Sequence, residues 1–424
     1  MTQPPLVSLV VLNWNGRAFL DDCLSSLERL DHPHDRLELI LCDNGSTDGS
    51  VEHVGDAHPR FKVIKLGHNR GFAEGNNRAA AQAMGEWVGF LNNDMEVPTD
   101  WLSAMLRPPA ARPGLACVAS RIVSWDGGLI DFIGGGINFQ GHGLQVDHGA
   151  ASSAHDVERP VLFACGGAML IRRQLFLEVG GFDPGYFAYF EDVDLGWRLN
   201  LLGHDIWYTP AATVRHRHHG TASRLPPYQL KVLSERNALY TIYKNYDAER
   251  LAAVLPVALG LLNEKALRML QFDRDLFGIP GASPPPPTPH SGGAAPARPG
   301  AMARIRQRGL VGALKAASLR LRHAVDGLLA RPPAVPPVSA TGAEIPLMAL
   351  SQLVTISEFV HNMERLREQR EWVQSRRRRT DHEVLGLGGV LLEDPTFGDS
   401  EYLDFQHWLS RVAGVDELFQ EVAR

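Results

Sequence analysis

The sequence lacks the features of a disulfide-stabilised, zinc-finger or membrane-spanning protein. Its 424 residues include only four cysteines, and no two of them form a CxxC pair: Cys23, Cys42, Cys117 and Cys165. This spacing argues against a disulfide framework or a structural zinc site and favours reduced thiols. The best candidate for a membrane segment, Leu251–Leu262, has about 12 apolar residues and contains Pro256, whereas a spanning helix needs roughly 17–25 residues. We expect this run to lie on a membrane at most and not to cross one alone.

The charge of the chain argues against a nucleic-acid-binding protein, and its first residues argue against a signal peptide. The formal net charge is −6 and the isoelectric point about 6.3, so the chain lacks the basic balance of a general nucleic-acid binder. Met1–Pro5 lead directly into a strand-like run, without the basic and apolar regions of a signal peptide. We therefore expect no nucleic acid as a partner. The expected location is the cytoplasm, either away from the membrane or at its inner face.

Apolar runs alternate with segments of helical periodicity in the N-terminal part of the sequence. With 44% hydrophobic residues, the chain can bury the cores of two or three domains. The alternation predicts the α/β class, with a Rossmann-like, mainly parallel sheet and helices on both faces. The expected strands are residues 6–12, 37–42, 61–66 and 86–91, and the expected helices are residues 17–30, 50–57 and 74–84.

Three of these strands end in turns that are rich in Asn and Asp. The turns are residues 13–15, 43–48 and 92–94. In a parallel sheet the carboxyl ends of the strands lie at one edge, and ligands bind outside that edge. We therefore expect the three turns to gather at one edge and to form a ligand site.

Differences in composition divide the rest of the chain into segments. Residues 127–160, rich in Gly and His, predict a loop or hairpin excursion, and residues 161–172 predict a strand. Gly166 and Gly167 within that strand would let a substrate approach the backbone closely. The expected organisation is an α/β domain over 1–225, an amphipathic helical extension over 226–280, a Pro- and Gly-rich linker with a short basic helix over 281–342, and a C-terminal helical region over 343–424.

Residues 227–275 allow two interpretations. Tyr240, Tyr243 and Tyr246, together with nearby basic residues, suit a helix on a membrane surface. Composition alone favours a helix packed on the N-terminal domain instead. In the C-terminal region, whose helices are candidates for contacts in a homo-oligomer, the tract Arg376–Arg379 indicates a solvated face.

A dense acidic cluster follows the aromatic stretch of residues 181–190. Three carboxylates within four residues, among them Glu191, repel one another unless a cation, a proton or a hydrogen bond compensates. In a helix, Asp194 and Arg198 are four residues apart and can pair, whereas Asp192 points elsewhere and stays available as a base. The alternative is an acidic helix start that the helix dipole favours.

Other polar residues fit a nucleotide or a metal. Asp43 and Asp48 can accept hydrogen bonds from a base or ribose, although a plain helix-capping turn is the alternative. Asp94 suits a metal that bridges two phosphates. His216 and His219 suit a manganese-like ion or a phosphate, with a solvated basic loop as the alternative.

Seven segments, taken in order, resemble family 2 glycosyltransferases with the GT-A fold, and most of all their rhamnosyltransferase-like subset. They cover roughly residues 5–225: VSLVVLNWNG, LILCDNGSTDGS, NRGFAEGNN, WVGFLNNDMEV, CGGAMLIRR, GGFDPGYFAYFEDVDLGWRLNLLGH and TVRHRHHGTAS. The resemblance implies that residues 1–225 form the catalytic domain of an inverting transferase and that this enzyme uses Mg²⁺ or Mn²⁺. It implies a dTDP- or UDP-linked donor, with rhamnose favoured, and a saccharide or lipid-linked acceptor in the synthesis of cell-surface polysaccharide or glycoconjugate.

The resemblance also implies roles for individual residues. Asp192 matches the general base. Asp94 matches the last Asp of the metal-binding motif, whose first Asp is replaced here by Asn92. His216 matches a histidine that completes the metal site in some relatives, with His219 as the alternative. The nucleotide-binding segments are matched by Asn13, Asn15, Asp43, Asp48, Asn69, Gly71, Phe72, Asn76 and Asn93, and acceptor-side or structural positions by Gly166, Gly167, Glu191, Asp194 and Arg198.

Other functions fit the sequence less well. A nucleotidyltransferase would carry a Gly-rich loop with Arg and Lys after the first strand, where this sequence has Asn-Trp-Asn-Gly. An NAD-binding oxidoreductase would need a G-x-G-x-x-G motif at the same place. A non-catalytic nucleotide-sugar-binding or scaffold relative stays open, and the presence of both Asp94 and Asp192 argues against it.

Overall fold

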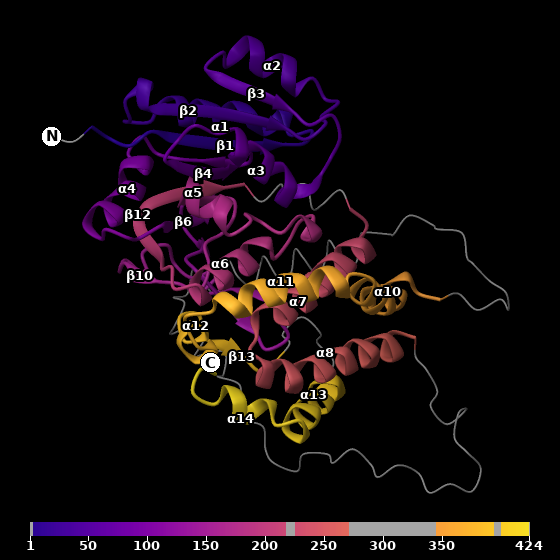
Figure 1. The fold of residues 1–424 in the computed structure, drawn as a ribbon. Coiled ribbons are helices and arrows are strands. Elements are labelled where there is room, and N and C mark those ends of the chain that lie inside the picture. Colours follow the sequence, from indigo (N-terminus) through magenta and orange to yellow (C-terminus); the bar gives the residue numbers. More distant parts are fainter. Residues whose placement is uncertain (1–2, 218–224, 271–344, 394–399, 424) are drawn as a thin grey trace, which may run out of the picture.

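The fold is that of a computed structural model of the chain, which describes residues 3–217, 225–270, 345–393 and 400–423. His219, the predicted linker at 281–342 and its basic helix lie outside the described residues. In Figure 1 the strands gather in the N-terminal part of the molecule, and helices from the C-terminal part form a layer beside them.

One ten-stranded sheet organises the N-terminal part (Figure 1). Along its main path the strand order is β10-β12-β6-β11-β4-β1-β2-β3, with β5 paired to β12 and β7 paired to β6. The strands are β1 (Val7–Asn13), β2 (Leu37–Asp43), β3 (Phe61–Lys65), β4 (Trp87–Asn92), β5 (Met95–Glu96), β6 (Cys117–Ser124), β7 (Ile130–Phe132), β10 (Arg159–Pro160), β11 (Ala168–Arg172) and β12 (Ile206–His216).

Strand direction confirms the predicted α/β class. β1 runs parallel to β2 and β4, and β2 runs parallel to β3. β6 and β12 run parallel to each other, and β11 lies antiparallel between β4 and β6. Between β12 and β3, therefore, β11 alone is reversed. The carboxyl ends of β1, β2 and β4 share one edge with the amino end of β11.

Helices cover both faces of the sheet, as predicted. Side chains alternate along β1, so that Leu9 packs in the cluster that contains α1 and Val10 in the cluster that contains α3. In α1 the buried residues recur at helical spacing from Leu20 to Leu27. The helices of this part are α1 (Arg17–Glu28), α2 (Ser50–Ala57), α3 (Gly71–Gln82), α4 (Trp101–Ala111), α5 (Arg173–Glu178) and α6 (Glu191–Leu201), with short 3-10 turns η1 (His34–Arg36) and η2 (Pro184–Tyr186).

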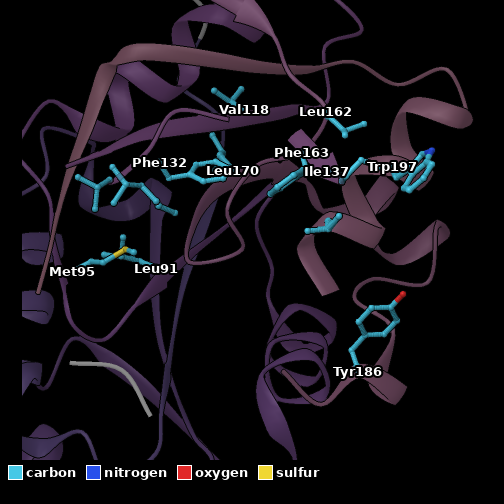
Figure 2. Close-up of a cluster of buried hydrophobic side chains, with 14 of the residues drawn as sticks. Leu91, Met95, Val118, Phe132, Ile137, Leu162, Phe163, Leu170, Tyr186 and Trp197 are labelled. Carbon is cyan, nitrogen blue, oxygen red and sulfur yellow. The ribbon is translucent and has the colours of Figure 1, made fainter. Parts of the chain in front are cut away.

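The strand predicted at residues 161–172 is shorter than expected, because β11 comprises only Ala168–Arg172. The preceding residues are buried, but the carbonyl of Leu162 accepts a hydrogen bond from Asn200 Nδ2 of α6 at 2.9 Å. Figure 2 shows Leu162 in the hydrophobic cluster that reaches from the sheet to Trp197 of α6. The apolar run thus indicated burial correctly, whereas its length as a strand was wrong.

The predicted excursion of residues 127–160 contains short strands. Besides β7 and β10, these are β8 (Gly135–Asn138) and β9 (Gly143–Gln145), which pair antiparallel. β8 also pairs in parallel with β13 (Val390–Leu391) of the C-terminal region. An element from the middle of the chain is thus completed by a strand from near its end.

The helices after residue 226 pack on the N-terminal domain, which is the second of the two interpretations. Tyr240 and Tyr246 are buried, and Tyr243 meets Phe359 edge-on at 5.7 Å between ring centroids. Among the described residues, no helix is both long and apolar enough to cross a membrane. These helices are α7 (Pro227–Asn245), α8 (Ala248–Met269), α10 (Leu347–His361), α11 (Met363–Arg376), α12 (Asp381–Leu385), α13 (Ser400–Val412) and α14 (Val415–Phe419).

A buried charge network joins the C-terminal helices to α6. Lys244 of α7 is 1% exposed and lies 2.8 Å from Asp183 and 2.9 Å from Asp194. Arg365 of α11 binds the same Asp183 at 2.8 Å. Burial opposes the ionisation of Asp183, but the charges of Lys244 and Arg365 outweigh it and lower the pKa of this carboxyl.

Only half of the tract Arg376–Arg379 forms the solvated face that the sequence indicated: Arg376 and Arg378 are exposed, whereas Arg377 and Arg379 are partly buried and paired. Arg377 binds Asp381 at 2.8 Å, and Arg379 binds Asp205 at 2.7 Å. The second contact reaches the segment that connects α6 to β12. A run of like charges in a sequence does not reveal which members find partners once the chain is folded.

Replacing Lys244 with Met should lower the free energy of unfolding by about 3–5 kcal/mol, because two buried carboxylates lose their shared cation. Urea denaturation followed by circular dichroism measures this change. The matched control is Lys62→Met, since Lys62 is 46% exposed and lies 3.7 Å from Glu38, and an exposed pair contributes roughly 0–1 kcal/mol. Equal losses in the two variants would contradict the stabilising role of the network.

Candidate active site

The ends of four strands meet at one edge of the sheet. The β1–β2 register places Asn13 opposite Asp43, and the β1–β4 register places Leu12 opposite Asn92. β11 runs the other way, so its first residue, Ala168, lies beside the end of β4. The three Asn- and Asp-rich turns therefore gather at one edge, as the strand pattern predicted.

A cavity of about 750 Å³ opens at this edge. Its wall comprises the ends of β1 and β4, the start of α3, the excursion around β9 and the segment before α6. The predicted site residues that line it are Asn69, Gly71, Phe72, Asn93, Asp94, Gly167, Glu191 and Asp192. Lining residues that the sequence analysis did not single out include Trp14, Asn44, Gln145, His148 and Tyr189.

Five predicted nucleotide-binding residues stand outside the described lining of this cavity: Asn13, Asn15, Asp43, Asp48 and Asn76. Asp43 accepts hydrogen bonds from the backbone N–H groups of Gly45 and Ser46 at 3.3 and 3.2 Å. Asn13 donates to Ser46 Oγ at 3.1 Å and accepts a hydrogen bond from Asn93 Nδ2 at 2.8 Å. These polar groups brace the turns that carry the cavity wall.

Asn44 links the turn after β2 to the turn before α3. Its Nδ2 donates to Asn69 Oδ1 at 2.9 Å, and its Oδ1 accepts from the backbone N–H of Arg70 at 2.8 Å. Gly71 follows with a φ of +81°, and a Cβ there would lie 2.4 Å from the carbonyl of Phe187. Only glycine permits this approach. The sequence analysis named Asn69 and Gly71 but missed Asn44.

Asp94 and His216 come together through the β5–β12 ladder, which pairs His216 with Met95. His216 Nε2 lies 3.4 Å from Asp94 Oδ2, and His216 Nδ1 lies 2.6 Å from Asp131 Oδ2 of β7. Burial disfavours the charged ring, but the hydrogen bonds with Asp131 and Asp94 outweigh it and raise the pKa of His216 to about 9. Sequence reasoning missed Asp131, a single acid in an apolar strand that no pattern distinguishes.

The donor set suits a divalent ion of the manganese type. One carboxylate and one imidazole form a mixed oxygen and nitrogen set that leaves positions for phosphate oxygens and water. Asp131 stands where an outer carboxylate orients a metal-binding imidazole. Asn92, the departure from the strict motif, is packed closely against the backbone, because a Cβ on Gly167 would lie 2.5 Å from Asn92 Nδ2.

Asp192 occupies the first turn of α6 and faces Gly166. Its Oδ2 accepts the backbone N–H of Gly166 at 2.9 Å, and its Oδ1 accepts that of Val193 at 2.8 Å. Burial raises the pKa of Asp192 against the opposing effect of these bonds. Burial, followed by the charge of Asp192, raises the pKa of Glu191 well above its usual range. Glu191 is therefore the first of the two carboxylates to take up a proton as the pH falls.

Asp194 and Arg198 point away from the cavity into the protein. Arg198 Nε donates to Asp194 Oδ2 at 2.8 Å, the pair that helical spacing predicted. Arg198 also donates to the carbonyls of Val179 and Gly181, both at 2.7 Å. This pair fixes α6 to the segment before it and has no direct access to a substrate in the cavity.

Comparison with known proteins identifies the family of this chain. The sequence model of the family described as Glycosyl transferase family 2 matches residues 8–180. An N-acetylglucosaminyl-diphospho-decaprenol L-rhamnosyltransferase of Mycobacterium tuberculosis is 30% identical over 249 residues, which are 53% of this chain and 80% of that protein. The chain belongs to glycosyl transferase family 2. The predicted family, its rhamnosyltransferase-like character and glycosyl transfer as the activity are thereby confirmed.

Two further proteins are similar to this chain over part of their length. The O-antigen biosynthesis protein RfbC of Myxococcus xanthus is 32% identical over 52% of this chain and 18% of its own length. The solved structure of GalNAc-T7 with UDP, GalNAc and Mn²⁺ superimposes with a TM-score of 0.48 and 17% identity, over 60% of this chain and 51% of that chain.

A strained aromatic segment precedes the acidic start of α6 in this family 2 glycosyltransferase. Phe187, Tyr189 and Phe190 have φ values of 62°, 69° and 66°, and such conformations cost about 1–3 kcal/mol each for residues other than glycine. All three line the cavity. Strain of this kind persists only where the surroundings impose it.

Asn237 of α7 imposes this conformation. It is fully buried, and its Nδ2 lies 3.0, 2.8 and 2.7 Å from the carbonyls of Tyr186, Ala188 and Tyr189. α7 lies beyond the residues that the family model matches. The sequence analysis noted the aromatic segment but not its strain, and Asn237 carried no signal, because a single polar residue in a helix has no pattern.

Replacing Asn237 with Ala should lower kcat by about 10- to 100-fold, because the segment that leads into Asp192 loses its donors and small misplacements of reacting groups are costly. Donor KM should change less, since the donor side of the cavity comes from other elements. Steady-state kinetics measure both. The control is Gln229→Ala at an exposed position of the same helix. A rise in donor KM with unchanged kcat would contradict this role.

Proposed function

We propose that this glycosyltransferase moves a sugar from a nucleotide-diphosphate donor to an acceptor hydroxyl with inversion at the anomeric carbon and with Mg²⁺ or Mn²⁺ as cofactor. The observation that carries the proposal is that Asp94, paired with His216, and Asp192 line one cavity. Asp94 and His216 support a cation beside a diphosphate, and Asp192 supports removal of a proton. Inversion rests on the family resemblance.

In the proposed reaction Asp192 accepts the proton of the acceptor hydroxyl, whose oxygen attacks the anomeric carbon while the bond to the diphosphate breaks. Gly166 N–H holds one oxygen of Asp192 in place. Asp94 and His216 would hold a divalent cation, which would supply Lewis-acid neutralisation of the diphosphate. Asp131 keeps the His216 ring oriented toward Asp94. No covalent intermediate with the protein is required.

The donor that we propose is a dTDP- or UDP-linked sugar, with rhamnose as the sugar. The support is the name of the M. tuberculosis relative, an L-rhamnosyltransferase that matches over most of its length. The same name supports a lipid-linked saccharide as the acceptor. Trp14, Tyr189 and Phe190 give the cavity apolar walls against which the faces of sugar rings can pack.

We further propose that the chain acts in the cytoplasm at the inner face of a membrane, where a lipid-linked acceptor is presented. The buried tyrosines of α7 do not support this, but α10 exposes Leu353, Val354 and Val360 by 42, 44 and 59%. An exposed apolar helix face suits contact with a lipid surface or with a second copy of the chain. If the chain forms a homo-oligomer, we propose that its copies associate through the C-terminal helices.

Replacing Asp192 with Asn should lower the transfer rate by about 100- to 10,000-fold without loss of nucleotide binding. Because burial raises the pKa of Asp192, the wild-type rate should fall as the pH drops through this raised value, where the base becomes protonated. Release of nucleotide from UDP-, GDP- and dTDP-sugars, with and without EDTA, measures the reaction and identifies the donor.

Glu191→Gln is the matched control for this substitution. It removes the neighbouring carboxyl whose pKa burial raises well above its usual range, so the loss of rate should be smaller than for Asp192→Asn. A larger loss of rate in Glu191→Gln than in Asp192→Asn would identify Glu191 as the base. Release that EDTA does not affect would exclude the cation, and a chain that binds no nucleotide would favour a scaffold relative.

Replacing Asp131 with Asn should weaken Mn²⁺ binding by about 10- to 100-fold, the usual cost of losing an outer partner of a metal-binding histidine. Electron paramagnetic resonance of free Mn²⁺, in the presence of nucleoside diphosphate, measures the affinity without turnover. The control is Asp156→Asn, the same substitution in the same excursion at a carboxyl that is 66% exposed. Equal affinities in the two variants would show that Asp131 has no part in the metal site.

A further inference from the structure

Three potential metal ligands converge on the surface formed by α1 and α2, outside the lining of the cavity. They are Asp21 of α1, His53 of α2 and His58, the residue that ends α2. One ligand atom from each lies within 4.8 Å of the other two. His53 Nε2 lies 2.5 Å and His58 Nε2 lies 3.3 Å from the same oxygen, Asp21 Oδ1.

The hydrogen bonds of His58 call for a positive charge between it and Asp21. His58 Nδ1 lies 3.0 Å from Glu28 Oε2, and because a carboxylate only accepts, Nδ1 carries the proton. In the neutral ring Nε2 is then an acceptor that faces another acceptor, Asp21 Oδ1. A bound cation between these two atoms would satisfy both acceptors. His58 is 5% exposed, so its ring cannot turn away easily.

Arg17 occupies the other side of the cluster. Its Nη2 lies 2.8 Å from His53 Nδ1, and its Nη1 lies 3.3 Å from Asp21 Oδ2. A guanidinium only donates, so it makes His53 Nδ1 an acceptor and leaves the proton on Nε2, directed at Asp21. A metal at His53 Nε2 therefore requires Arg17 to leave, and its side chain is 37% exposed and free to rotate into solvent.

We propose that Asp21, His53 and His58 bind a zinc ion in competition with Arg17. Two imidazoles and one carboxylate, with water in the fourth position, form a zinc site, and ligand distances of about 2.0–2.2 Å place the donor atoms roughly 3.3 Å apart. The His58–Asp21 distance already matches this spacing. Glu28 acts as the outer carboxylate that orients His58.

The ion would join α1 to α2 across the turn that follows β2. The backbone N–H of Arg17 donates to Asp48 Oδ2 of that turn at 2.9 Å. The cluster therefore lies next to the hydrogen bonds that hold the turns on the proposed nucleotide-sugar side of the cavity. Zinc binding therefore stabilises the framework of this edge. The inference does not depend on the transfer reaction or on the cation at Asp94.

The test is a zinc titration of the full chain in competition with a chromophoric chelator. Asp94→Asn and His216→Ala are introduced first, so that the cavity no longer contributes ligands. We expect one zinc ion per chain and a rise of the melting temperature with zinc. Asp21→Ala and His53→Ala should each weaken binding by more than about 100-fold, since losing an outer partner alone costs roughly 10- to 100-fold.

Arg17→Ala gives the most specific readout, because it should strengthen zinc binding by removing the competing cation. Glu28→Gln should weaken binding by about 10- to 100-fold and tests the site even if Asp21→Ala does not fold. His34→Ala, an exposed histidine outside the cluster, should change nothing. Absence of binding, binding that survives loss of His53, or weaker binding in Arg17→Ala would each overturn the proposal.

Discussion

The reversed strand β11 decides where the active site of this glycosyltransferase lies. Because β11 is antiparallel to β4, its amino end meets the carboxyl end of its neighbour at the binding edge. Gly166 and Gly167 come directly before β11. The carbonyl of Gly167 accepts the N–H of Asn92 at 2.9 Å, and the N–H of Gly166 binds Asp192. Two consecutive peptide groups thus hold the turn that contains Asp94 on one side and Asp192, the proposed base, on the other.

The proposed base, Asp192, lies on a helix that follows the residues matched by the family model. The family model ends at residue 180, before α6 begins. Asp183 and Asp194 are buried on either side of Asp192 in sequence, and buried carboxylates need cations close by. Arg198 comes from α6 itself, whereas Lys244 and Arg365 come from α7 and α11. The C-terminal helices therefore supply part of the charge balance of the carboxylates around α6.

Two histidines have the same arrangement of carboxylates at the two metal sites that we propose. In His216 and in His58 a carboxylate lies at Nδ1, Asp131 in the first case and Glu28 in the second. A second carboxylate faces Nε2 in both. At His216 these groups border the cavity, where a diphosphate would share a cation. At His58 they lie on the surface between two helices, where a second imidazole would complete the ligand set.

The sequence by itself determined the α/β class, the order of strands and helices up to β4 and the edge at which the polar turns gather. These follow from local periodicity and from the rule that parallel strands end together. It also indicated Asp94, His216 and Asp192, because they lie in dense motifs. Tertiary structure alone decided that Asn13 braces a turn instead of lining the cavity, since its hydrogen-bond partners, 33 and 37 residues away in the sequence, are invisible to periodicity. The same holds for Asp131 and Asn237, whose roles arise only because β7 and α7 are folded against the site.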